Sequence, residues 1–171
     1  MRRLLADAAF GGLSRRDALA YIPAQITGCI TGAVVANAMF SLAAISISDN
    51  HRASPAHLFA EVIATLGLLL VIFALARSGR ISTAPAAVGA YIGAAYWFTS
   101  STSFANPAIT IGRMFSDSFA GIAPASAPAF VVAQLMGAVF AFALIRTLYP
   151  DVTPADAAQV VMPHRDAPAR P

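Results

Sequence analysis

Residues 103–113 are the most informative stretch of this chain, and they read Ser103-Phe104-Ala105-Asn106-Pro107-Ala108-Ile109-Thr110-Ile111-Gly112-Arg113. Asn106 is a favourable helix N-cap, and the proline after it already has the backbone angle of a first helical residue. The stretch therefore predicts a half-helix over 106–115. Long apolar segments flank it, so the helix start is expected at membrane depth. There, polar backbone is tolerated only against protein or beside a water-filled path.

The remainder of the chain has the composition of a membrane protein. Of its 171 residues, 58% are hydrophobic and 11% are charged, which is unlike an ordinary soluble domain. A helix needs roughly 20 apolar residues to cross the hydrocarbon core. Four segments meet this length, at about 18–45, 57–76, 81–100 and 128–149. We therefore predict an all-α membrane protein with four transmembrane helices and one re-entrant half-helix.

The arginines predict the orientation of these helices. All eleven basic residues are arginine, and nine of them lie before the first segment, between the second and third, or at and after the end of the fourth. Only Arg52 and Arg113 lie elsewhere. The positive-inside rule then places both termini and the 77–80 connection in the cytoplasm, in a multi-pass protein of the plasma membrane or cell inner membrane. Residues 151–171 are rich in Pro, Ala and Asp and are expected to form a disordered cytoplasmic tail.

Two segments of the chain repeat each other. The first apolar segment contains Ala24-Gln25-Ile26-Thr27-Gly28, and the fourth contains Ala133-Gln134-Leu135-Met136-Gly137. Both put Ala-Gln-x-x-Gly near the start of a crossing. Many channels and transporters are built from inverted repeats, so the match indicates two related halves.

The Asn106-Pro107-Ala108 box followed by Gly112 resembles the signature of the aquaporin (major intrinsic protein) family. The repeated Ala-Gln-x-x-Gly is similar to the start of that family's third and sixth helices. The resemblance covers about residues 5–150, and it implies that 1–150 forms the C-terminal two-thirds of an aquaporin-like inverted-repeat fold. The family has two boxes, whereas this sequence has one. Asn106 precedes Gln134 by 28 residues, and the same offset before Gln25 gives position −3. We therefore expect a truncated member, or a start site assigned too late, beginning just after the place of the first box.

The resemblance also implies roles for residues of a pore. Asn106 would donate a hydrogen bond to a passing solute, Pro107 would start the half-helix, and Ala108 would pack at the junction. Aquaporins usually have an arginine directly after the box, where this chain has Ile109. Family spacing places Ala94 and Ser103 at the same outer constriction. These small residues imply a wide constriction for neutral solutes larger than water. The stretch is most similar to bacterial aquaporins linked to arsenic resistance, which are thought to pass neutral metalloid hydroxides.

Other polar residues within the apolar segments are expected to support the fold. By resemblance, Glu61 would accept hydrogen bonds from backbone N–H groups of the loop before Asn106, since a carboxylate at that depth must be paired or functional. Gln25 and Gln134 are expected to hold helices together. Arg113 is costly within the half-helix, and Asp7, at the corresponding place in the other repeat, is an available partner.

The sequence argues against several other functions. It contains no catalytic triad pattern, phosphate loop or cofactor motif, so we predict no enzyme activity and no cofactor. The histidines and Cys29 lack the spacing of a metal site, and no separate basic face suggests nucleic-acid binding. The expected partners are the lipid bilayer, small neutral solutes and, by family resemblance, further copies in a tetramer. Four crossings cannot enclose the lumen of a six-helix channel. An inactive remnant and a membrane interaction subunit therefore remain alternatives to a passive channel.

Overall fold

The computed structural model describes residues 15–148, and every regular element within them is helical. This confirms the all-α prediction. The long helices are α2 (Arg15–Met39), α3 (Pro55–Arg77), α4 (Ala84–Phe98) and α6 (Ala127–Leu148), and the short helix α5 spans Pro107–Gly112. Three 3-10 turns, η1 (Ile81–Thr83), η2 (Arg113–Phe115) and η3 (Pro124–Ser126), adjoin them. Asp7 and the expected tail 151–171 lie outside the described residues.

Among the described residues, three helices are long and apolar enough to cross a membrane: Leu19–Met39, Pro55–Arg77 and Pro124–Leu148. The expected segment 81–100 forms a shorter helix, because α4 has 15 residues and ends at Phe98. Thr99 stops it, adopting an extended backbone while its hydroxyl donates to the carbonyl of Ala95. Length and composition therefore support three crossings directly, and α4 is shorter than the sequence predicted.

The first helix also ends earlier than the expected 18–45. Helix α2 stops at Met39, and Ser41 follows with a φ of 57°, in the left-handed region. Asn37 explains the early end. Its side-chain amide donates to the carbonyls of Ala44 (3.2 Å) and Phe115 (3.0 Å), so it turns the chain back along the end of η2. The segment that follows is an extended loop and not a helical turn.

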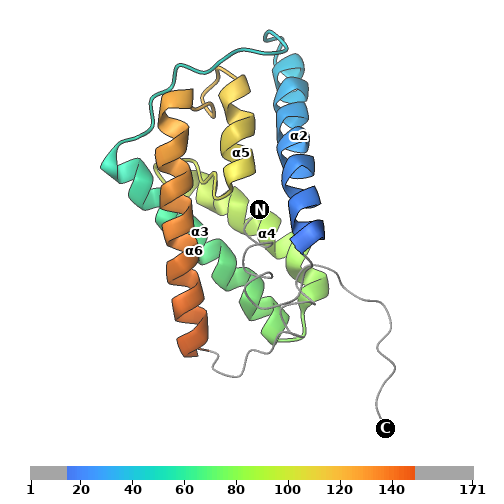
Figure 1. Ribbon diagram of the computed structural model, residues 1–171, viewed down its shortest axis with the longest axis vertical. Coiled ribbons are helices and arrows are strands. Elements are labelled where there is room, and N and C mark those ends of the chain that lie inside the picture. The colour runs from blue at the N-terminus through green and yellow to red at the C-terminus, as the bar shows by residue number, and fades with distance from the viewer. Residues whose placement is uncertain (1–14, 149–171) are drawn as a thin grey trace.

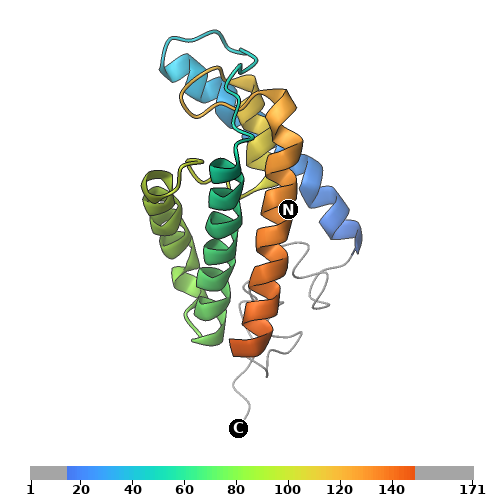
Figure 2. The same ribbon diagram turned by 90° about the vertical axis from the view of Figure 1, so that its left-hand side faces the viewer.

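The main core lies between α3 and α6, which cross in the view of Figure 1 and stand side by side in Figure 2. Leu69 and Phe73 of α3 pack against Ala141 and Ile145 of α6. Gly137 permits the close approach, because a Cβ there would lie 2.5 Å from the carbonyl oxygen of Val62. The two helices thus form a close apolar contact around these residues.

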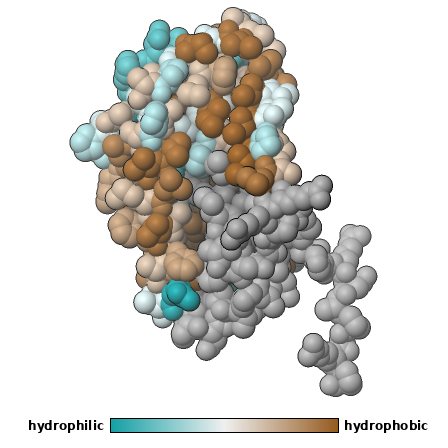
Figure 3. All heavy atoms as spheres, viewed as in Figure 1, coloured by the Kyte–Doolittle hydropathy of each residue, from teal (hydrophilic) through white to brown (hydrophobic). Residues whose placement is uncertain are grey.

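Helix α5 lies between α2 and α6 (Figure 1). Gly112 brings it directly against α2, since a Cβ there would sit 2.7 Å from the Cβ of Cys29. The rest of α2 is largely exposed and apolar on the face seen in Figure 3, with Leu19, Val35 and Met39 more than half exposed. Helix α2 therefore contributes one wall beside α5 and presents the remainder of its surface outward.

Candidate functional site

The start of α5 is capped by Asn106. Its side-chain oxygen accepts the N–H of Ala108 at 2.9 Å, and its own backbone carbonyl accepts the N–H of Thr110 at 2.9 Å. Because the N–H of Ala108 requires an acceptor, the amide must present oxygen to the helix. The amide nitrogen then points elsewhere, and within the described residues it donates to no partner. The cap thus leaves two N–H hydrogens for another molecule.

The loop before Asn106 has an unusual backbone. Thr102, Ser103 and Ala105 have φ values of 60°, 45° and 49°, in the left-handed region that residues other than glycine seldom adopt. Such residues cost about 1–3 kcal/mol each and persist only where the surroundings hold them. Residues 101–105 are all buried. Strong local contacts must therefore fix this loop.

Glu61 of α3 supplies those contacts. It is completely buried, and its two carboxylate oxygens accept four hydrogen bonds. One oxygen accepts the hydroxyl of Ser101 (2.7 Å) and the N–H of Phe104 (2.9 Å). The other accepts the N–H of Ala105 (3.0 Å) and the side-chain amide of Gln134 (2.6 Å). The buried charge is therefore surrounded by donors, which is how a carboxylate is accommodated away from water.

Gln134 extends this network to α5. The same amide nitrogen that donates to Glu61 also donates to the hydroxyl of Thr110 at 2.9 Å. The hydroxyl of Thr110 in turn donates to the backbone carbonyl of Asn106 at 3.1 Å. One continuous set of hydrogen bonds thus joins α3, α6, the loop and the helix start. Gln25, on α2, is half-buried.

The direction of the loop N–H groups also sets the direction of its carbonyls. The described residues contain no cis peptide bond, so each carbonyl points opposite to the N–H of the following residue. The N–H groups of Phe104 and Ala105 face Glu61, and the carbonyls of Ser103 and Phe104 therefore face away from it. Neither carbonyl accepts a hydrogen bond within 15–148. The loop consequently presents two free acceptors next to the free donor of Asn106.

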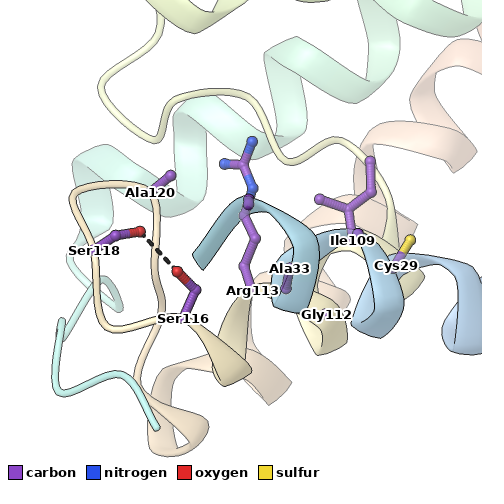
Figure 4. A pocket seen from close by; sticks show the side chains of 10 residues that line it. Cys29, Ala33, Ile109, Gly112, Arg113, Ser116, Ser118 and Ala120 are labelled. Carbon is purple, nitrogen blue, oxygen red and sulfur yellow. Dashed lines mark hydrogen bonds between the residues drawn. The ribbon is translucent and has the colours of Figure 1, made fainter. Parts of the chain in front are cut away.

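Ile109 and Arg113 come together on the next turn. Both line a cavity of about 330 Å³ between α2, α5 and the 116–120 loop, and Figure 4 shows their side chains projecting the same way. Small residues of α2, Gly32, Ala33 and Ala36, also line it. The other residues expected at the constriction lie elsewhere. Ser103 is in the buried loop with an unpartnered hydroxyl, and Ala94 is exposed on α4.

Sequence reasoning missed the residues that hold the loops between α2 and α3 and between η2 and η3. Arg52 is 8% exposed, and its guanidinium donates to the carbonyls of Gly121 (2.7 Å), Ser101 (3.4 Å) and Phe119. Burial lowers the pKa of Arg52 from its usual value, while Tyr96 and Glu61 act in the opposite direction. The available signal was its position, because Arg52 lies away from the arginines from which the orientation was predicted.

Comparison with known proteins agrees with this arrangement. The profile of the family described as Major intrinsic protein matches residues 4–105 and, in a second match, 86–167. Two overlapping matches to one family are what an internally repeated fold produces. The chain belongs to the major intrinsic protein family. It is therefore a multi-pass membrane protein of a channel family and not an enzyme.

One curated relative of this major intrinsic protein is the aquaglyceroporin AqpS of Rhizobium meliloti (strain 1021), which is 46% identical over 144 residues. The match covers 84% of this chain and 61% of the relative. The chain thus spans about three-fifths of the length of the relative that it matches. No solved structure matches the chain significantly.

Proposed function

We propose that this chain forms the solute-selecting part of a passive channel for small neutral solutes, with neutral metalloid hydroxides among them. The observation on which this rests is the grouping at the start of α5. The free amide nitrogen of Asn106 and the free carbonyls of Ser103 and Phe104 provide one donor and two acceptors side by side. A hydroxylated solute both accepts and donates hydrogen bonds, so it can exchange its water for these groups as it passes.

The side chain after the box supports a solute larger than water. Ile109 is apolar and cannot reach across a pore to donate hydrogen bonds, as the arginine common in the family would. The cavity that it lines is about 330 Å³, and small α2 residues line it as well. A constriction between Ile109 and small side chains is wide and weakly polar. That favours uncharged solutes with several hydroxyl groups over a strict water file.

In this proposal α5 is a re-entrant half-helix and α4 is the third of four crossings, with both chain termini on the cytoplasmic side. Within the described residues, a Cβ added at Gly28 or Gly32 would have no neighbouring atom within 4 Å, so no described segment covers this side of α2. A closed lumen then requires a further segment or another copy of the chain. The relative, of which this chain covers 61%, shows that a longer member of the family exists.

Vesicle flux tests the proposal. A chimaera would join this chain to the part of the Rhizobium meliloti relative that it does not match, and stopped-flow light scattering would follow water, glycerol and arsenite in empty and loaded vesicles. We expect flux of all three, and we expect Ile109→Arg to slow glycerol and arsenite far more than water. Water flux alone would contradict the wide constriction. If the chain of 171 residues alone gives no flux above empty vesicles, it needs the added wall. Flux equal to that of the chimaera would show that copies of the chain complete the pore.

A further inference from the structure

Arg113 and Arg52 are the two arginines that the orientation of the chain does not explain, and the structure brings them together. The Cζ atom of Arg113 lies 4.3 Å from the centre of the Phe104 ring, and that of Arg52 lies 5.7 Å from the same centre. Phe104 itself is completely buried in the loop before Asn106. Two guanidinium groups thus lie against the same aromatic ring, in the loop next to the start of α5.

Both arginines are held by neutral groups. Arg113 donates to the hydroxyl of Thr102 at 3.3 Å and also lies 5.9 Å from the ring centre of Tyr96. Arg52 donates to three backbone carbonyls. Among the side chains described, those of residues 19–148, no Asp or Glu forms an ion pair with either guanidinium, and Glu61 accepts all four of its hydrogen bonds from neutral donors. Their positive charge is therefore not cancelled by a direct partner.

The position of Arg113 relative to Ile109 gives this charge its significance. The two residues are four apart, which is about one helical turn, and they line the same cavity (Figure 4). Helix α5 has only six residues, so its dipole is a weak source of positive potential compared with a full guanidinium charge. A cation approaching Ile109 from the outer loops would meet Arg113 first.

We propose that Arg113, with Arg52 behind it, supplies the fixed positive charge that excludes cations at the outer constriction in place of an arginine at position 109. This inference rests on the proposed channel function and extends it. A single arginine at the constriction would both narrow the pore and supply the positive charge. Placing the charge one helical turn away from position 109 separates these two effects. The pore at Ile109 stays wide for bulky neutral solutes, while the positive potential still opposes cations and protons and favours anions at the mouth.

The rate at which charged reagents label a cysteine at position 109 measures this potential without requiring flux. The parent protein for the test is Ile109→Cys with Cys29→Ala, so that a single thiol remains. The probes are two methanethiosulfonates of similar size, one with a sulfonate and one with a trimethylammonium group, and an uncharged methanethiosulfonate reports accessibility. We expect the ratio of anionic to cationic labelling rates to exceed that of free cysteine, and to fall about tenfold in Arg113→Gln, because the reagents differ by two unit charges.

Three comparisons make this test decisive. Arg113→Lys keeps the charge and should keep the ratio within about threefold. Arg146→Gln is a matched control, because Arg146 also lies over an aromatic ring, Phe142, but at the far end of α6; it should leave the ratio unchanged. High salt should lower the ratio in the parent, because it screens the charge. A parent ratio equal to that of free cysteine, insensitive to salt, would overturn the proposal even if Arg113→Gln fails to fold.

The same proteins separate this inference from the proposed function. In the chimaera, Arg113→Gln should admit a proton or potassium leak while glycerol flux persists. If no chimaera passes glycerol but the ratio of anionic to cationic labelling rates is high, the proposed channel function is refuted, while the positive potential at position 109 is still supported. If Arg113→Gln keeps normal glycerol flux and changes neither the ion leak nor the ratio of labelling rates, the role of Arg113 is refuted and the channel function is not.

Discussion

Replacing Glu61 by alanine should destabilise the folded protein more than any other single change in the site. The substitution leaves the N–H groups of Phe104 and Ala105 without an acceptor, and these residues are 0% and 1% exposed. A buried unsatisfied donor costs about 1–3 kcal/mol, so the loss is about 2–6 kcal/mol before Ser101 and Gln134 are considered. The left-handed residues of the loop would then also be free to relax.

A graded series makes this prediction sharper. Glu61→Gln keeps the shape but replaces one acceptor oxygen with a donor, so one backbone N–H should remain unsatisfied, at about 1–3 kcal/mol. Asp117→Ala is the control, because Asp117 is exposed and accepts only the N–H of Asp49, at 3.2 Å. It should change stability by at most about 0.5 kcal/mol.

Far-UV circular dichroism during titration of mixed micelles with dodecyl sulfate would give the free energy of unfolding of each variant. The expected order of stability loss is Glu61→Ala, then Glu61→Gln, then Asp117→Ala. A loss for Glu61→Ala as small as that of the control would refute the reasoning, because it would show that the loop N–H groups find other acceptors at no cost.

Two further predictions use other contrasts in the chain. Gly137→Ala should separate α3 from α6 and destabilise the protein, because a Cβ there would meet the backbone of α3. Gly28→Ala should stabilise the protein by up to about 1 kcal/mol through helix propensity, because no described atom lies within 4 Å of its Cβ position. Equal effects in the same titration would argue against the packing. In a Cys29→Ala background, a membrane-impermeant maleimide added outside intact cells should label Ala53→Cys and not Ser78→Cys, and the opposite pattern would reverse the proposed orientation.

The sequence predicted helix positions well where a helix end is determined by interactions between neighbouring residues. Ser54 and Pro55 start α3 as N-cap and first helical residue, and the expected segment 57–76 lies within Pro55–Arg77. The Asn106 cap of α5 follows from the same chemistry. The predicted end of the first helix, at residue 45, was wrong. The helix ends at Met39 because Asn37 forms a hydrogen bond with Phe115, which lies 78 positions away in the sequence. No periodic pattern contains that information.

The loop residues of the site were harder to anticipate for a related reason. Ser101 and Thr102 are unremarkable in the sequence, yet they bond to Glu61 and Arg113. Their positions depend on a backbone that passes through the left-handed region at residues other than glycine, which propensity argues against. The buried carboxylate of Glu61 makes that backbone favourable, so the loop conformation follows from the tertiary contacts and not from the local sequence.

Arg113 shows that the strained loop and the charge at the mouth depend on each other. From the sequence, the cost of its charge suggested a carboxylate partner at Asp7, which lies outside the described residues. Within them, the guanidinium is stabilised by the face of Phe104 and the hydroxyl of Thr102. Both groups belong to the loop that Glu61 holds in its left-handed conformation. Relaxing the loop would therefore withdraw the ring and the hydroxyl together. A negative charge buried on α3 thus fixes the place of a positive charge on η2 through a neutral loop between them.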